Sequence, residues 1–242
     1  LLAVYSFMDS AIIGRSGSFT VKNYVYLFHS EDLRSMIFGT LILAVVVAVI
    51  STILGTLGAI GAFYSSKKLK RPIHLMNQIP VVNADVVTGF SICVLLIVFF
   101  KMDKASYIPL VIGLVSLCSP FVYLSVIPRL KQMDPQLYEA ALDLGCSPFG
   151  ALRKVVLPQL TSGIVSGFMM SITLTLDDYF ITTYTKPSMF DTISTYVVNA
   201  TKGAQTDVKT ALWALSTIIF LIVIFVVIGM NHTGRKENDH EI

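Results

Sequence analysis

Charged residues are scarce in this 242-residue chain, where Asp, Glu, Lys and Arg make up 14% of the sequence. An ordinary soluble domain carries about 25% of them. Hydrophobic residues account for 54%, and they gather into runs about as long as a bilayer is thick. The composition therefore argues against a soluble enzyme and favours a helical protein embedded in lipid. The small net charge of +3 gives no reason to expect binding to nucleic acid.

Motifs for metal binding and catalysis are also missing from the sequence. Neither the three cysteines nor the four histidines show the spacing of a metal site, and the cysteines show no disulfide framework. The G-x-x-x-x-G-K-[ST] phosphate loop does not occur, and neither do H-E-x-x-H and G-x-S-x-G. We therefore expect no catalytic residue, no metal, no cofactor and no ATP site in this chain.

Long apolar runs predict the helices that cross the membrane. The apolar segment 1–8 is too short to cross about 30 Å of hydrocarbon, and we expect it to be the end of a truncated first span. Pro80 and Pro120 are expected to kink or break the helices that contain them. The predicted fold is an all-α polytopic membrane protein with six helices in one transmembrane domain over residues 1–242. The five further spans are predicted over residues 36–63, 73–100, 107–128, 157–184 and 211–230.

A short basic loop indicates how these helices are oriented. Residues 65–71 contain three lysines and one arginine but no acid. The positive-inside rule therefore places this loop in the cytoplasm. The same topology puts residues 129–156, here called the cytoplasmic segment, and the tail 231–242 on the same side.

The cytoplasmic segment is long for a simple turn and is predicted to form two short helices. Asp134, followed by a proline, is a suitable N-cap, and Gly145 suits the left-handed residue that ends a helix. Ser147, again followed by a proline, repeats the N-terminal pattern for a second helix. The segment is either a solvated amphipathic connector or a lever that presents a helix to a cytoplasmic partner.

A longer motif begins in this segment and ends at the start of the next span. It reads E-A-A-x3-G-x11-L-P and consists of Glu139, Ala140, Ala141, Gly145, Leu157 and Pro158. The motif resembles the EAA loop of type I ABC-transporter permeases, which precedes their penultimate span. Residues 171–185, SITLTLDDYFITTYT, more narrowly resemble one permease subunit of spermidine/putrescine importers. The resemblance covers essentially the whole chain and implies the transmembrane domain of a type I ABC importer.

The resemblance implies an ATP-driven importer of polyamines in the bacterial cytoplasmic membrane, working by alternating access. Its implied partners are a second permease subunit, two copies of a cytoplasmic ATPase, an extracytoplasmic binding protein that delivers the polyamine, and membrane lipid. In the family, the first helix of the EAA loop docks on the ATPase. The implied coupling residues are Glu139, Ala140, Ala141, Asp143, Gly145, Leu157 and Pro158.

Three aspartates, Asp85, Asp177 and Asp178, fall within the predicted spans. A charge at the bilayer centre costs about 2.5 to 3.5 kcal/mol on insertion scales, so such acids are functional candidates. Asp177 and Asp178 are expected near the outer boundary, where their charge suits an incoming polycation. Adjacent side chains on a regular helix point about 100° apart, so the sequence leaves open which one faces the pathway. The alternative is that both simply meet water or lipid headgroups.

Other pathway candidates surround these acids. Asp85 lies near the break expected at Pro80, and either lines the pathway or caps the restarting helix, the structural role being preferred. Tyr179, Phe180 and Tyr184 lie beside the paired acids, where aromatic rings make cation-π contacts with amines. Anchoring at the membrane interface is the more common role for tyrosines at this depth.

Two alternative functions are compatible with the sequence. The chain is either the permease of an ABC importer for another small solute, or a secondary transporter or channel for cations that uses the three aspartates. The two-helix cytoplasmic segment separates these possibilities, because a self-contained carrier does not require it.

Glycines at helical spacing predict close approach between helices. Gly55, Gly58 and Gly61 are three residues apart, and Gly163 and Gly167 are four apart. Packing within the chain is the preferred interpretation, and an interface between subunits is the alternative.

Overall fold

The protein is described from a computed structural model, and it is built of helices over the described residues. Described residues are 6, 7, 19, 20, 25, 29–66, 72, 73, 75, 77, 85–103, 105–134, 136–202, 217, 220, 221 and 224. Most of the expected spans 1–8 and 211–230 lies outside them, as do Pro80, Pro135 and the tail 231–242. The helices are α3 (Glu31–Tyr64), α5 (Asp85–Cys93), η1 (Val94–Phe99), α6 (Ile108–Gln132), α7 (Gln136–Asp143), α8 (Pro148–Ala151), η2 (Leu152–Val156), α9 (Leu157–Gln159), α10 (Thr161–Asp177), α11 (Phe180–Thr185) and α12 (Ile193–Lys202).

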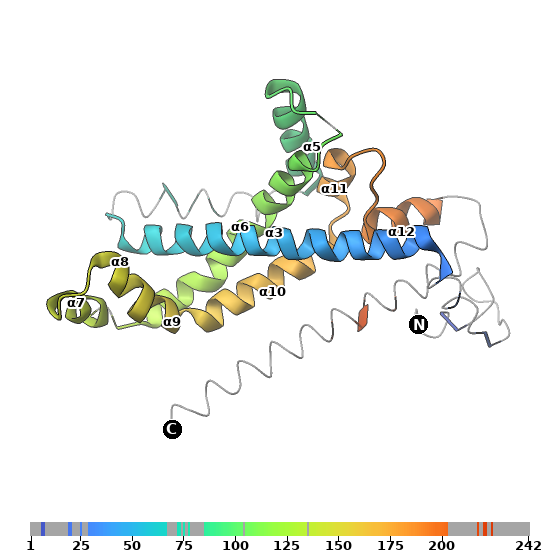
Figure 1. The fold of residues 1–242 in the computed structure, drawn as a ribbon. Helices are drawn as coiled ribbons and strands as arrows, with labels where there is room; N and C mark the ends of the chain where they lie inside the picture. The colour runs from blue at the N-terminus through green and yellow to red at the C-terminus, as the bar shows by residue number, and fades with distance from the viewer. Residues whose placement is uncertain are drawn as a thin grey trace.

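Three long helices, α3, α6 and α10, pack against one another and form the body of the described structure (Figure 1). Within the part of the chain that the structure describes, two helices are long and apolar enough to cross a membrane, Leu33–Tyr64 and Ile108–Gln132. The helix pair Pro148–Gln159 and Thr161–Asp177 makes a third span if it is counted as one, although it is bent by 71°. The expected ranges 36–63 and 107–128 lie on α3 and α6.

Glycines allow these three helices to approach closely, and Val122 of α6 lies where they meet. A Cβ atom added to Gly55 of α3 would lie 2.6 Å from Val122 Cβ, and one added to Gly167 of α10 would lie 3.0 Å from Val122 Cγ1. Val122 is fully buried. Gly163 of α10 also faces α6: a Cβ atom added to it would lie 3.0 Å from the Ser125 carbonyl oxygen. Gly55, Gly163 and Gly167 therefore serve packing within the chain, as preferred from the sequence, whereas nothing lies within 4 Å of a Cβ added to Gly61.

The hydrophobic core divides into two clusters at the two ends of this bundle. One joins the C-terminal half of α3 to α6, and reaches the cytoplasmic segment through Val156 and Leu160. The other joins the N-terminal half of α3 to the start of α6 and to Ile181 of α11. Each cluster therefore links the long helices to one of the two regions that carry functional candidates.

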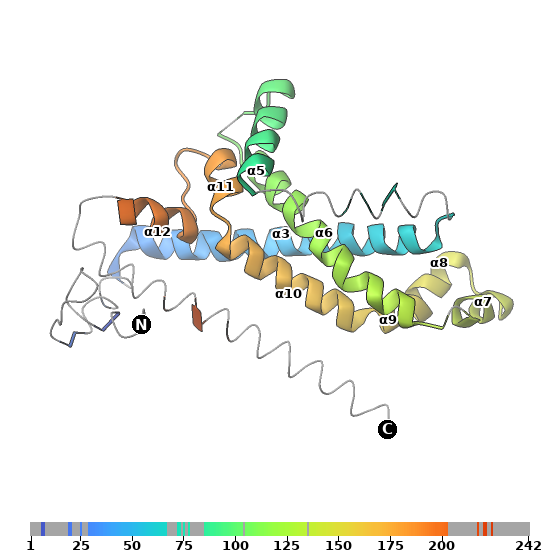
Figure 2. The ribbon, with the colours of Figure 1, turned by 180° about the vertical axis from the view of Figure 1, so that it is seen from behind.

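The functional candidates lie at opposite ends of α3. The cytoplasmic helices α7 and α8 lie at its C-terminal end, where the rings of Tyr64 and Tyr138 are 4.9 Å apart between centroids. α12 lies at the other end, where the Ile193 N–H donates to Thr40 Oγ1 at 3.2 Å (Figures 1 and 2). α3 ends at Tyr64, beside α7, and most of the basic loop that follows lies outside the described residues.

The expected continuity of the fifth span is wrong, and of the kink or break expected at Pro120 the break does not occur. The range 157–184 is not one regular helix: it is bent at Leu160 and interrupted at Asp178, whose backbone is extended with ψ of 124°. Pro120 does not break its helix, because α6 runs through it without interruption. Over the described part of the range 73–100, the chain forms α5 and the six-residue π-helix η1.

Candidate functional site

The cytoplasmic segment forms the two short helices that its sequence predicts. The carboxylate of Asp134 accepts a hydrogen bond from the Gln136 N–H at 2.9 Å, just before the first turn of α7. Gly145 ends this helix in the left-handed region with φ of +83°, where a side chain would be strained. Ser147 Oγ then accepts from the Gly150 N–H at 3.2 Å and caps α8. Local capping chemistry therefore builds the helix–turn–helix.

The outer surface of this element carries both acids and large apolar side chains. Glu139, Ala140 and Asp143 are exposed on α7. Leu144 is 86% exposed and Phe149 is 75% exposed. The two apolar residues are not part of the motif recognised in the sequence. The sequence could have indicated them, because they lie on either side of Gly145 in a segment predicted to face solvent. Large apolar side chains exposed in that way mark contact surfaces.

The remaining motif residues serve other structural purposes. Ala141 is buried and turns toward the protein. Gly145 is exposed in the turn between the helices. Leu157 and Pro158 belong to the bend that leads into α10, where the Pro158 carbonyl accepts a hydrogen bond from Thr161 Oγ1 at 2.8 Å. The motif thus combines an exposed helix face with the bend that connects it to the membrane helix.

The cytoplasmic segment contacts the C-terminal ends of α3 and α6 through Tyr138. Tyr138 of α7 contacts Tyr64, the last residue of α3, with the rings inclined by 44°. Tyr138 also packs on the cluster that contains Leu130 and Met133 from the end of α6. α7 therefore contacts the ends of both α3 and α6.

The two adjacent aspartates have different environments. Asp178 is 9% exposed, and its Oδ2 accepts hydrogen bonds from both the N–H and the Oγ1 of Thr182, each at 2.8 Å. These bonds hold the first turn of α11. Asp177 is exposed, and its backbone carbonyl accepts from Ser194 Oγ at 3.3 Å. The structure therefore gives Asp178 a positioning role and leaves the carboxylate of Asp177 accessible.

The short helix α11 is held tightly by its neighbours. Ile181 is fully buried between two glycines: an added Cβ would lie 3.0 Å from Ile181 Cα at Gly89 and 2.8 Å from Ile181 Cγ2 at Gly113. The Tyr184 ring contacts Phe90 of α5 edge to face at 5.8 Å. α11 and α5 accordingly lie side by side, away from the α3–α10 contact (Figures 1 and 2).

The three aromatic candidates lie in two places: Tyr179 and Phe180 beside the paired acids, and Tyr184 against α5. Tyr179 and Phe180 contact each other at 5.3 Å, next to the paired acids, and Phe180 is 41% exposed. Tyr184 instead packs on α5, and its backbone carbonyl accepts from the Cys93 thiol at 3.2 Å. Asp85 is the first residue of α5, and its role in the pathway stays a prediction. Among the described residues, no group of three His, Cys, Asp or Glu side chains is placed to hold a metal.

Known proteins resemble this chain along most of its length. Residues 54–233 match the family described as binding-protein-dependent transport system inner membrane component. The chain is 28% identical over 239 residues to the spermidine/putrescine transport system permease protein PotC of Escherichia coli strain K12, covering 98% of this chain and 88% of that protein. It is also 28% identical over 232 residues to the putrescine transport system permease protein PotI of the same strain, covering 90% and 79%.

A solved structure shares the fold. It is the bacterial alginate ABC transporter in complex with an alginate pentasaccharide-bound periplasmic protein. One of its chains matches with a TM-score of 0.72 and 17% identity, covering 90% of this chain and 83% of that chain. Proteins that share the fold therefore include a transporter of a very different solute.

Proposed function

Because this chain belongs to the family of binding-protein-dependent transport system inner membrane components, and is an ABC-transporter permease, we propose that it imports polyamines. Spermidine and putrescine are the proposed substrates, and the bacterial cytoplasmic membrane is the proposed location. The proposed complex contains a second permease subunit, two copies of a cytoplasmic ATPase and an extracytoplasmic protein that delivers the polyamine.

The observation that best supports coupling to an ATPase is the exposed surface of α7 and α8. It combines two acids, Glu139 and Asp143, with the exposed apolar side chains of Leu144 and Phe149. Carboxylates four residues apart repel each other by about 0.2 to 0.5 kcal/mol on a helix, and cationic groups of a partner relieve that repulsion. The contacts of Tyr138 with the ends of α3 and α6 support the proposal that a movement of α7 is passed to these helices.

The proposed mechanism is alternating access. Closure of the two ATPase subunits on ATP displaces α7, and the displacement passes through Tyr138 to α3 and through the bend at Leu160 to α10. Asp178 keeps α11 in place by accepting the two hydrogen bonds from Thr182. Asp177 is the residue of the pair that we assign to the passing cation.

Two resemblances support a polyamine as the solute, namely those to the curated spermidine/putrescine and putrescine permeases. The fold by itself is compatible with other solutes, as the alginate transporter illustrates. An exposed carboxylate at the outer end of α10 suits a cation rather than an acidic sugar. Uptake assays with both classes of solute therefore test the proposal.

The substrate test uses the complete complex reconstituted in vesicles. Uptake of labelled spermidine and putrescine is measured for the wild type, for Asp177→Asn and for the control Asp103→Asn, which removes an exposed carboxylate from another loop. We expect saturable uptake that Asp177→Asn reduces and Asp103→Asn leaves unchanged. Wild-type vesicles that hydrolyse ATP but accumulate neither polyamine would show that the permease carries another solute.

The coupling test reverses one charge on α7. Glu139→Lys is expected to weaken association with the ATPase and to reduce ATP hydrolysis stimulated by the delivery protein. Gln132→Lys places a lysine at an exposed position outside α7 and is the control for adding a cationic side chain near this surface. Normal assembly and normal stimulated hydrolysis in Glu139→Lys would contradict the assigned contact.

A further inference from the structure

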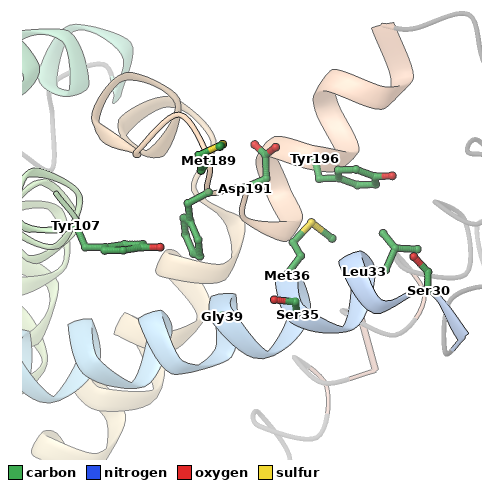
Figure 3. Close-up of a pocket in the computed structure, with 10 residues that line it drawn as sticks. Ser30, Leu33, Ser35, Met36, Gly39, Tyr107, Met189, Asp191 and Tyr196 are labelled. Atoms are coloured by element: carbon green, nitrogen blue, oxygen red, sulfur yellow. The ribbon is translucent and has the colours of Figure 1, made fainter. Parts of the chain in front are cut away.

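A cavity of about 620 Å³ lies at the N-terminal end of α3, on the side opposite the cytoplasmic segment. It is bounded by α3, by the start of α6, and by the loop and first turn that join α11 to α12 (Figure 3). Small-molecule sites typically occupy about 300 to 1,000 Å³. The cavity is therefore large enough for a small organic solute. Its lining includes Met36, Tyr107, Phe190, Asp191 and Tyr196.

The loop wall of the cavity is fixed by contacts to the long helices. Phe190 meets Tyr107 edge to face, with 5.2 Å between the ring centroids. Its ring also rests on Gly39, where an added Cβ would lie 3.0 Å from Phe190 Cε2. Three residues after Phe190, the Ile193 N–H donates to the fully buried hydroxyl of Thr40. The aromatic rings are consequently held in place rather than free to collapse into the cavity.

Asp191 supplies a negative charge to this cavity. Its Oδ1 atom pairs with the Lys186 ammonium group and also accepts from Thr195 Oγ1 at 3.2 Å. The side chain of Asp191 is 43% exposed, whereas that of Lys186 is 15% exposed. Lys186 has a second acceptor in the Phe190 carbonyl at 2.9 Å. A ligand cation can thus share or replace the contact with Asp191 while Lys186 keeps a hydrogen-bond partner.

Carboxylate and aromatic rings around one cavity are the groups that recognise an organic ammonium ion. The adjacent structure carries a further acid, since Ser194 at the start of α12 donates to the carbonyl of Asp177. Resting on the function proposed above, we infer that this cavity is a receiving site for the polyamine. The ammonium groups of the ligand contact Asp191 and the rings of Tyr107 and Tyr196 before the ligand moves to Asp177.

Two variants distinguish a cation site from a purely structural ion pair, because each removes one member of the pair. Asp191→Asn removes the charge that would bind the ligand, whereas Lys186→Gln removes the competing cation. If the pair were only structural, both changes would weaken the loop and act in the same direction. If Asp191 binds the ligand, they act in opposite directions.

The measurement is equilibrium binding of labelled spermidine to the complete complex in nanodiscs, without the delivery protein. Loss of a charge-assisted contact predicts a dissociation constant about tenfold higher for Asp191→Asn. Lys186→Gln is expected to bind as tightly as the wild type or more tightly, and Asp191→Glu to restore binding. Tyr107→Leu is expected to weaken binding more than Tyr107→Phe, which keeps the ring. Thermal unfolding of each variant complex checks that it is folded.

The outcomes separate this site from the proposed function. Equal weakening by Asp191→Asn and Lys186→Gln, or unaltered binding in Asp191→Asn, overturns the receiving site. Absence of saturable spermidine binding to the wild-type complex overturns it as well. In each case, spermidine uptake by the wild type in the vesicle assay leaves the importer function standing, whereas absence of uptake refutes that function.

Discussion

Replacing Gly55 by alanine tests the close contact between α3 and α6. The added Cβ would lie 2.6 Å from Val122 Cβ and 2.8 Å from the Ser119 carbonyl oxygen. Carbon atoms in favourable contact are about 3.5 to 4.0 Å apart, so the overlap with Val122 is about 1 Å. Both neighbouring atoms belong to rigid parts of α6, namely a β-branched side chain and the backbone. The helices must therefore move apart to admit the methyl group.

The magnitude follows from a comparison along the same helix. Overpacking of this kind costs about 1 to 3 kcal/mol. Alanine also favours the helix by up to about 1 kcal/mol relative to glycine. Gly61→Ala receives the same propensity gain without a clash, because nothing lies within 4 Å of the added Cβ. The difference in stability between the two variants therefore isolates the packing cost and should be about 1 to 3 kcal/mol.

Thermal unfolding of the purified complex in one detergent measures this difference. Gly55→Ala is expected to lower Tm, whereas Gly61→Ala should leave Tm unchanged or raise it. Equal Tm values for Gly55→Ala and Gly61→Ala would refute the reasoning.

The remaining predictions concern the caps and the cytoplasmic contact. Asp178→Ala removes the acceptor for Thr182 and should destabilise the complex by about 1 kcal/mol, whereas Asp178→Asn keeps an acceptor and stays near wild type in thermal unfolding. Gly145→Ala forces a side chain into the left-handed region at a cost of about 1 kcal/mol, and should weaken ATPase association more than Gly145→Asn. Tyr138→Leu breaks the ring contact with Tyr64, and should lower spermidine uptake per ATP hydrolysed while leaving ATPase association intact.

The cytoplasmic segment was predictable from sequence because its structure is determined locally. An aspartate or serine followed by proline indicates a helix start, and Gly145 indicates a helix end. The structure has these features where the sequence places them. Apolar runs likewise placed α3 and α6, since helices that cross lipid must satisfy their backbone groups internally.

The break at Asp178 was not predictable in the same way. Asp178 and Thr182 are four residues apart, a spacing equally suited to two side chains on one regular helix. The break is visible only in the structure, where the extended backbone of Asp178 ends α10 and Ile181 of α11 packs against Gly89 and Gly113. The cavity at Asp191 was missed for a related reason: its walls come from three distant parts of the chain, and no short motif links them.

The interrupted fifth span also has a consequence for membrane insertion. α10 contains 17 residues, which is about 26 Å of helix and less than the hydrocarbon thickness. Asp177 is its last residue and Asp178 follows it, and each acid disfavours insertion from water. Asp178 obtains its hydrogen bonds only once α11 has formed, and α11 is seated by α5 and α6. Both of those helices precede α11 in the chain, so Gly89 and Gly113, which contact Ile181, are synthesised before Asp178 needs its partner.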